Sequence, residues 1–263
     1  MKKDVQKTAI VVPCYNEAQR LRIQEYLAYA NENENVYFFF VNDGSTDGTR
    51  QLLDTLCHKN PAQMLCIQQP KNCGKAAAVR QGFLKAMAMG FDYIGYWDAD
   101  LSTPLRPIST FCEILEDPHI TLVMGSRIKI LGRQIDRLAV RHYLGRVFAT
   151  AASILLQIPV YDTQCGAKIF RNNLELKKAF SIPFSVKWTF DVELLARYKI
   201  IKDYLNRLPV EASTIEYPLK KWIHVSGSKI EFKDYFLVGM ELFILFLSLY
   251  APLIARKYAR QFE

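Results

Sequence analysis

Short apolar runs alternate with helical patterns through the first half of this chain, and this alternation most constrains its fold. Uncharged, β-prone runs of this length indicate buried strands. Strands that alternate with helices predict the α/β class, with a doubly wound, mostly parallel sheet and right-handed crossovers. The predicted strands are Thr8–Val12, Val36–Val41, Met64–Ile67, Tyr93–Trp97 and Ile120–Met124, and the predicted helices are Glu17–Ala30, Thr49–His58, Lys75–Met89 and Leu105–Leu115.

Two aspartates, Asp98 and Asp100, directly follow the run Tyr93–Trp97. Open α/β sheets bind ligands in the crevice outside the carboxyl ends of their strands. Two neighbouring carboxylates are costly to hold without a cation between them. Mg²⁺ takes one or two carboxylates and completes its shell with substrate phosphates and water. The pair therefore predicts a metal held by Asp98 and Asp100 against a diphosphate, although an isolated Asp-x-Asp is also common in loops.

Other polar segments follow the neighbouring predicted strands. Asp43 can accept hydrogen bonds from a base edge, and Lys75 lies beside a helix amino terminus, a setting that attracts phosphate. Arg127 offers a guanidinium to phosphate oxygens. Each segment alone is ordinary turn chemistry, but their places at successive strand ends indicate one shared site. The segments are Val11–Glu17, Val41–Thr49, Asn72–Val79 and Gly125–Arg127.

The second half of the chain begins with a basic stretch from Arg127 to Arg146. Arg133, Arg137 and Arg141 are four residues apart, so in a helix they share one face. An apolar stretch, residues 147–156, follows. Two interpretations remain open: a core helix with a solvated basic shoulder, or a surface that binds anionic groups.

The carboxyl-terminal segment Tyr235–Ala255 is apolar, and Glu241 is its only charge. A membrane span needs about 20 apolar residues, so the length permits one. Asp234, Glu241 and Ser248 are seven residues apart and form a narrow polar stripe, while basic residues flank both ends. This pattern favours a helix that lies in the membrane interface. A spanning helix, a buried helix and a dimer contact are the alternatives.

Composition limits the class of protein. The chain has 263 residues and a net charge of +8, which favours anionic partners such as nucleotides, nucleic acid or an acidic leaflet. A nucleic-acid partner is set aside because no recognition module or aromatic–basic pattern is present. The six cysteines form no C-x-x-C pair, and the amino terminus has no signal-peptide core. We therefore expect reduced cysteines and a cytosolic catalytic part.

The motifs P-x-Y-N-E, N-D-G-S-T-D-G-T, N-x-G-K, D-A-D-L-S-T-P and G-S-R occur in this order. As a set they resemble family 2 glycosyltransferases with the GT-A fold, and within them the polyprenyl-phosphate sugar transferases. The later pieces Asp162–Phe170, Trp188–Leu194 and Gly227–Lys229 are similar to dolichyl-phosphate β-glucosyltransferases. The resemblance implies a Rossmann-like nucleotide-sugar-binding half plus an acceptor half in residues 1–230. Residues 231–263 would form a membrane-associating helical segment.

The resemblance also implies roles for individual residues. One group would hold the base and ribose: Pro13, Tyr15, Glu17, Val41 and Asp43. The sugar diphosphate would be bound by Lys75 and, through Mg²⁺ or Mn²⁺, by Asp98, Ala99 and Asp100. Arg127 and Lys229 would neutralise phosphate charge, and Arg141 would meet the acceptor phosphate. The aspartate pair is followed by Leu101-Ser102 rather than the Leu-Gln of the mannosyl enzymes. This difference favours a glucosyl enzyme and leaves the third metal ligand open.

A phosphate acceptor removes the need for a general base, because its second pKa is about 6 and it is already an oxyanion at pH 7. We therefore expect inverting transfer of glucose from UDP-glucose to a polyprenyl phosphate, at the cytoplasmic face of a membrane. Donors such as GDP-mannose or UDP-N-acetylglucosamine remain alternatives. A sugar hydroxyl as acceptor would need Asp191 or Glu193 as the base. A binding protein without chemistry is a third hypothesis.

Overall fold

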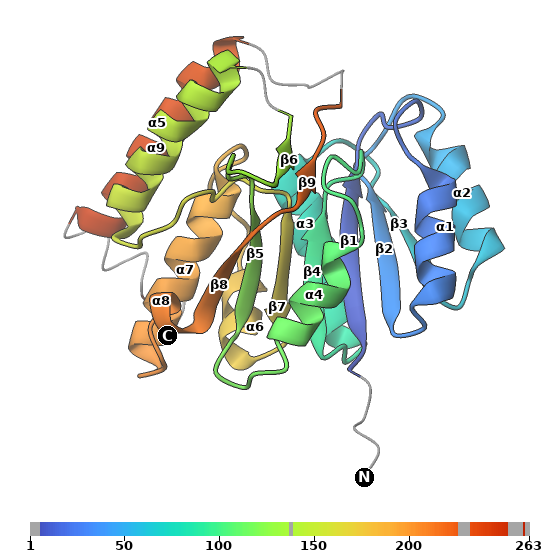
Figure 1. The fold of residues 1–263 in the computed structure, drawn as a ribbon, viewed down its shortest axis with the longest axis horizontal. Helices are drawn as coiled ribbons and strands as arrows, with labels where there is room; N and C mark the ends of the chain where they lie inside the picture. The colour runs from blue at the N-terminus through green and yellow to red at the C-terminus, as the bar shows by residue number, and fades with distance from the viewer. Residues whose placement is uncertain (1–5, 137–138, 226–231, 252–259, 261–263) are drawn as a thin grey trace.

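The computed structural model describes residues 6–136, 139–225, 232–251 and 260. A central sheet lies between two layers of helices, with a smaller sheet beside it (Figure 1). The strands are β1 (Thr8–Cys14), β2 (Val36–Asn42), β3 (Met64–Gln68), β4 (Tyr93–Trp97), β5 (Leu122–Ser126), β6 (Gln134–Ile135), β7 (Ala167–Arg171), β8 (Thr214–Pro218) and β9 (Lys221–Trp222). The main sheet has the order β3-β2-β1-β4-β7-β5-β8, and β6 pairs with β9.

Helices cover both faces of the main sheet. The helices are α1 (Ile23–Glu32), α2 (Thr49–Lys59), α3 (Lys75–Ala88), α4 (Pro107–Ile114), α5 (Ala139–Leu156), α6 (Leu174–Ser181), α7 (Phe190–Tyr204), α8 (Val210–Ser213) and α9 (Phe232–Tyr250). One buried cluster joins the sheet to α3, α5, α6, α7 and α9, and the other joins it to α1, α2 and α4. The predicted doubly wound, mostly parallel α/β fold is confirmed, including all five predicted strands and four predicted helices.

Two local features differ from the prediction. The first helix begins at Ile23 rather than Glu17, because the backbone N–H groups of Arg20 and Leu21 close a turn on the carbonyl of Glu17. Strand β7 was not predicted; it lies antiparallel between β4 and β5. Its apolar pattern is interrupted by Lys168, which is nevertheless completely buried. Because a lysine interrupts the apolar run, the sequence pattern of this segment does not indicate a buried strand.

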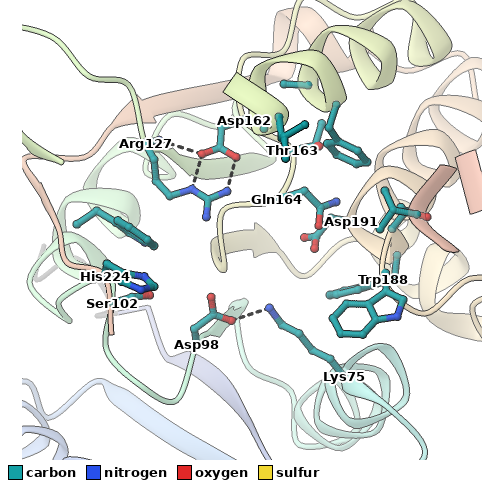
Figure 2. A pocket seen from close by; sticks show the side chains of 18 of the residues that line it. Lys75, Asp98, Ser102, Arg127, Asp162, Thr163, Gln164, Trp188, Asp191 and His224 are labelled. Atoms are coloured by element: carbon teal, nitrogen blue, oxygen red, sulfur yellow. Dashed lines mark hydrogen bonds and ion pairs between the residues drawn. The ribbon is translucent and has the colours of Figure 1, made fainter. Parts of the chain in front are cut away.

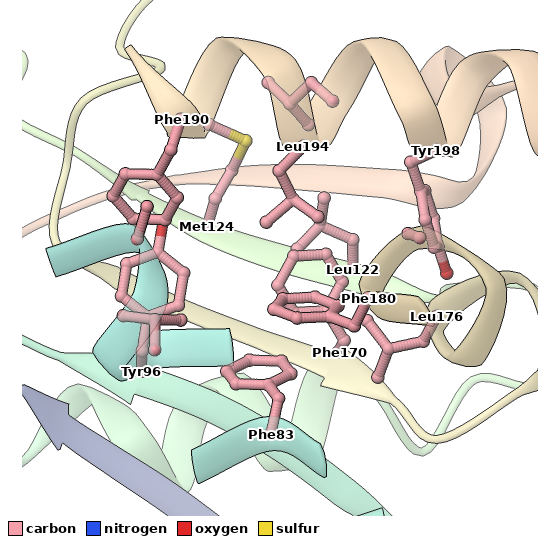
Figure 3. Packing of buried hydrophobic residues seen from close by; sticks show 14 of the residues in the cluster. Phe83, Tyr96, Leu122, Met124, Phe170, Leu176, Phe180, Phe190, Leu194 and Tyr198 are labelled. Carbon is pink, nitrogen blue, oxygen red and sulfur yellow. The ribbon is translucent and has the colours of Figure 1, made fainter. Parts of the chain in front are cut away.

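An aromatic core fixes α7 against the sheet (Figure 3). The ring of Phe83 on α3 stacks on Phe180 of α6, with centroids 4.2 Å apart. Tyr96 of β4 lies 5.8 Å from Phe190, the first residue of α7. Aromatic contacts of this kind add to the stabilisation that burial of the rings provides. The core therefore places the amino terminus of α7 beside the carboxyl end of β4.

Helix α9 follows the same layer as α5 and lies beside it (Figure 1). Leu245 is buried in the core cluster, and the Tyr250 hydroxyl donates to the carbonyl of Leu155 at 2.6 Å. Its other side exposes apolar residues: Phe236, Leu237, Met240, Phe243, Ile244 and Phe246. In the described part of the chain, no helix combines the length and apolarity needed to cross a membrane.

The expectation that all six cysteines are reduced is wrong in one respect. Cys57 of α2 and Cys66 of β3 form a disulfide, because the packing of α2 against β3 brings their Cα atoms to 6.4 Å. The other four cysteines are thiols. Cys165 is fully buried, and this burial raises the pKa of its thiol to about 12.

These positions predict the result of a thiol titration. Without reductant, the unfolded protein should present four thiols to Ellman's reagent. The folded protein should react rapidly only at the exposed Cys73, since a buried thiol of high pKa supplies almost no thiolate. Six reactive thiols after unfolding would contradict the disulfide.

Candidate active site

Two adjoining cavities open at the carboxyl ends of the central strands. The first, of about 450 Å³, lies beside β1 and β2 and is lined by residues that include Pro13, Tyr15 and Asp43. The second, of about 470 Å³, lies beside β5 and α7 and is lined by residues that include Arg127 and Asp191. Both cavities share five lining residues: Lys75, Asp98, Asp100, Lys187 and Trp188.

Asp98 and Asp100 lie at the junction of the two cavities. Asp98 Oδ1 pairs with the ammonium of Lys75 at 2.6 Å (Figure 2). Its other oxygen lies against Gly166, where an added Cβ would come within 1.9 Å of it, so only glycine permits this approach. Asp100 Oδ1 accepts a hydrogen bond of 3.0 Å from the backbone of Ser102.

Lys75 remains cationic in this setting. Burial acts to lower the pKa of its ammonium, but the carboxylates of Asp98, Asp191 and Asp100 outweigh burial and raise this pKa above its ordinary value. Lys75 begins α3, directly after Gly74, which has φ of +93°. A cation and a helix amino terminus thus meet at the junction, an arrangement that favours an anionic group.

The first cavity gathers four of the five residues predicted to hold a base and ribose: Pro13, Tyr15, Glu17 and Asp43. Asp43 also has a local task, because its two oxygens accept from the backbone N–H groups of Cys73 and Gly74 at 2.7 and 2.8 Å. These bonds hold the turn before α3. Ala99 lines the same cavity. The fifth residue, Val41, lies in the hydrophobic core with no exposed surface.

Arg127 faces the second cavity but is already paired. Its Nε and Nη2 donate to the two carboxylate oxygens of Asp162 at 2.6 and 2.7 Å (Figure 2). Burial acts to lower the pKa of the guanidinium, but Asp162 outweighs burial and the net pKa is raised. The guanidinium is thus permanently charged and rigidly oriented. Its carbon also lies 5.5 Å from the centre of the Trp222 ring.

Asp191 lines the second cavity, yet its carboxylate is engaged in a buried network. Its Oδ1 accepts from Lys168 Nζ at 2.6 Å and from the Tyr96 hydroxyl. The same ammonium also donates to the carbonyls of Thr163 and Cys165, which satisfies its three N–H groups. The Asp191 carboxylate is therefore bound by Lys168 and Tyr96 in a buried network that the sequence did not indicate.

Glu193, the other candidate base, is completely buried and ion-paired with Arg197 at 2.6 Å. It also accepts hydrogen bonds from the backbone of Ser185 and Val186. Glu193 does not line either cavity. Its position assigns it to holding the loop before α7 rather than to proton transfer.

Two predicted residues fall outside this description. Lys229 lies outside the described residues, and Arg141 lies in the first turn of α5 without a described side chain. The structure adds lining residues to which the sequence assigned no individual role, chiefly Lys187, Gln164 of the piece Asp162–Phe170 and Arg146 at the end of the basic stretch. The guanidinium of Arg146 stacks 3.7 Å from the centre of the Tyr161 ring. A basic residue with an aromatic partner distant in sequence gives no local signal.

Across the described residues, no three His, Cys, Asp or Glu side chains gather into a group that could hold a metal ion. Asp98 and Asp100 are the two carboxylate residues that line both cavities, and their side chains are partly exposed. Two carboxylates suit a hard cation that takes its remaining ligands from phosphates and water. The donor set at this site therefore fits a divalent ion that binds together with a phosphorylated ligand.

The model of the family Glycosyl transferase family 2 matches residues 9–176. The chain belongs to glycosyltransferase family 2. It is 30% identical over 252 residues to a dolichyl-phosphate beta-glucosyltransferase of Trichomonas vaginalis, covering 89% of this chain and 72% of the relative. It is 31% identical over 242 residues to that of Saccharomyces cerevisiae, covering 84% and 68%.

The fold of this glycosyltransferase is shared by solved structures of lower identity. Glucosyl-3-phosphoglycerate synthase from Mycobacterium tuberculosis, in complex with Mn²⁺, UDP-glucose and phosphoglyceric acid, superposes with a TM-score of 0.60 at 16% identity. The match covers 92% of this chain and 79% of that one. This likeness supports the predicted GT-A fold.

Proposed function

We propose that this glycosyltransferase transfers glucose from UDP-glucose to a polyprenyl phosphate, with inversion at the anomeric carbon. The observation that carries the proposal is the pair of adjoining cavities that meet at Asp98 and Asp100. Such an arrangement accommodates a donor on one side and an acceptor on the other, with the reacting centre between them. The named activity of the relatives supplies the sugar and the lipid class.

We assign the donor to the first cavity. Its lining by Pro13, Tyr15 and Asp43 suits a base and ribose, and its end at the junction would place the diphosphate beside Lys75. Lys187 is exposed at the same junction and brings a second ammonium. Two cations near the diphosphate would stabilise the charge that develops on the departing nucleotide.

We further propose that Asp98 and Asp100 hold Mg²⁺ or Mn²⁺ against the donor diphosphate. A bound divalent cation would supply Lewis-acid stabilisation of the leaving diphosphate. The pairing of Asp98 with Lys75 would keep one carboxylate oriented toward the junction. Mn²⁺ accompanies UDP-glucose in the solved structure named above, which supports the choice of a divalent ion for a fold of this kind.

We assign the acceptor to the second cavity. Arg127 lines one part of this cavity, and the apolar residues Leu144 and Phe148 of α5 line another part. A polyprenyl phosphate matches this lining, because its phosphate is charged and its polyprenyl chain is apolar. Arg127, held by Asp162, would orient the attacking phosphate or neutralise the leaving one. Arg141 and Lys229 are proposed to add positive charge to the same reaction.

The partner set of Asp191 favours a phosphate acceptor over a sugar hydroxyl. A general base must be within hydrogen-bond reach of the proton that it takes, whereas the Asp191 carboxylate is buried and already accepts from Lys168 and Tyr96. A phosphate acceptor needs no such base. The oxyanion would attack the anomeric carbon as the bond to the diphosphate breaks, which gives a β-linked product from an α-linked donor.

The exposed apolar faces of α5 and α9 are proposed to lie on a membrane surface, at its cytoplasmic face. On α5 the exposed residues include Tyr143, Val147 and Ile154, and on α9 they include Phe236 and Phe243. Apolar patches on monomers commonly mark interaction sites. The net charge of +8 would add attraction to anionic lipid headgroups. A homo-oligomer through the same face is the alternative.

A transfer assay tests the proposal. Detergent-solubilised enzyme would receive a polyprenyl phosphate with UDP-glucose, UDP-N-acetylglucosamine or GDP-mannose, in Mg²⁺, Mn²⁺ or EDTA. We expect a glucosyl lipid phosphate from UDP-glucose with either metal and none in EDTA. Donor binding without lipid product would move the acceptor to a sugar hydroxyl, and preference for another donor would correct the hexose.

A further inference from the structure

One carboxylate of α9 reaches away from its own helix into the wall of the active site. Glu241 is the only charged residue among the described side chains of α9, residues 236–250. It shares its side of the helix with Leu245, which is buried in the core. Glu241 is half-buried, and withdrawing a carboxylate from water is costly unless it is well hydrogen-bonded. Its partners therefore indicate which groups it holds.

The partners of Glu241 are consecutive groups just before α7. Its carboxylate accepts from the backbone N–H groups of Lys187 at 3.0 Å, Trp188 at 3.0 Å and Thr189 at 2.8 Å. It also accepts from the Thr189 hydroxyl at 2.9 Å. Thr189 is the N-cap residue of α7, and its own side chain makes no capping bond. Of these N–H donors only that of Thr189 belongs to the end of α7, so Glu241 chiefly holds the segment that leads into the helix. Its negative charge also lies near the helix amino terminus, where it is favourable.

The segment that Glu241 holds, residues 187–189, belongs to the active-site wall. Lys187 and Trp188 line both cavities, and Thr189 lines the second. The contacts of Leu245 and Tyr250 already anchor α9 without Glu241. The carboxylate is therefore not needed merely to attach the helix, whereas three consecutive N–H groups of the wall depend on it.

We propose that Glu241 is a positioning residue, which sets the place of Lys187 and Trp188 where the two cavities meet. The seating of α9 thereby controls the geometry of the site. This inference rests on the proposed function in one respect, because α9 also carries part of the face assigned to the membrane. A helix seated on lipid would then hold the wall in the conformation that the two substrates need.

The first test is amide hydrogen exchange, which requires no substrate. In Glu241→Ala, exchange at residues 187–189 should accelerate by at least about tenfold, since each N–H loses a bond to a charged acceptor. Ser248→Ala is the matched control on the same helix, because among the described residues its hydroxyl donates to the carbonyl of Ile244 within that helix and not to the segment before α7. It should leave exchange at residues 187–189 unchanged. Unaltered exchange in Glu241→Ala would overturn the inference.

The second test is a kinetic double-mutant cycle. Glu241→Ala should lower kcat/KM for glucosyl transfer by about 100-fold, the scale that a misplacement of about 1 Å can cause. In a Lys187→Ala/Trp188→Ala background the same substitution should change kcat/KM little, because the side chains through which it acts are gone. Effects that multiply would refute positioning and indicate general damage to the fold.

The two tests separate this inference from the proposed function. If the wild-type enzyme transfers no sugar to a polyprenyl phosphate, the proposed function fails, while the exchange result still decides the role of Glu241. Glu241→Gln extends the series, since its amide keeps one accepting oxygen. It should fall between the wild type and Glu241→Ala in both measurements, and exchange at residues 187–189 as fast in Glu241→Gln as in Glu241→Ala would count against the assignment.

Discussion

Asp100→Asn is expected to reduce sugar transfer by about 10³-fold, the upper end of the loss when one preorganised electrostatic group is removed. Asp100 lies where the two cavities meet and is one of two carboxylates suited to a divalent ion there. The amide oxygen of the variant can still accept the bond from the Ser102 backbone, so the local turn should persist. The measurement is the initial rate of glucosyl lipid formation at saturating metal and donor.

Asp92→Asn is the matched control for this experiment. Asp92 lies just before the opposite end of β4 and accepts from the backbone of Lys7 at 2.8 Å, far along the strand from the cavities. Its replacement should leave transfer within about twofold, because Asp92 lines neither cavity and a surface substitution changes stability by only about 0.5 kcal/mol or less. Full activity of Asp100→Asn, or of the wild type in EDTA, would contradict the assignment of Asp98 and Asp100 to the metal.

Arg197→Met is expected to lower the free energy of unfolding by about 3–5 kcal/mol, because removing one partner of a buried ion pair leaves the other charge uncompensated. Neither Arg197 nor Glu193 has any exposed side-chain surface, and their closest atoms are 2.6 Å apart. The guanidinium also donates to the carbonyls of Ala179, Ile182 and Pro183. Urea unfolding monitored by circular dichroism measures the change.

The exposed pair Arg22–Glu25, with atoms 3.0 Å apart, supplies the comparison. Arg22→Met should cost less than about 1 kcal/mol, because water screens the charges of a surface pair. A second comparison is Glu193→Gln/Arg197→Met, which removes both charges and should recover part of the loss. A destabilisation by Arg197→Met no larger than that by Arg22→Met would contradict the buried charge pair as the source of stability.

The first half of the fold was accessible from sequence because its elements are locally encoded. Runs such as Tyr93–Trp97 are apolar throughout, since a central strand with helices over both sides of the sheet is buried on both faces. The observed strand has the predicted bounds. In the second half, β7 carries the buried Lys168, and its ion pair with Asp191 forms only after α7 has packed on the sheet. Because Asp191 lies 23 residues away, no local sequence pattern indicates that this lysine is buried.

The candidate site divides in the same way. Asp98, Asp100 and Lys75 stand at strand ends or helix starts, so topology alone brings them to one edge of the sheet. Val41 shares a motif with Asp43, but it lies inside β2, which is buried on both faces, so its side chain packs in the core, whereas Asp43 follows the end of the strand and lines the cavity. The pairing of Arg127 with Asp162 and the reach of Glu241 into the loop before α7 depend on how separate elements pack.

The sequence by itself determined the α/β fold, the edge of the sheet that carries the site and the carboxylates at the centre of the site. The fold follows from short-range periodicity, and the site follows from which residues end a strand. The tertiary structure alone decided which charges are already paired, that Asp191 and Glu193 belong to buried networks, and that Glu241 of α9 holds the segment before α7. These features depend on contacts between residues far apart in the chain, whose free energy is set by burial and geometry that only the packed molecule defines.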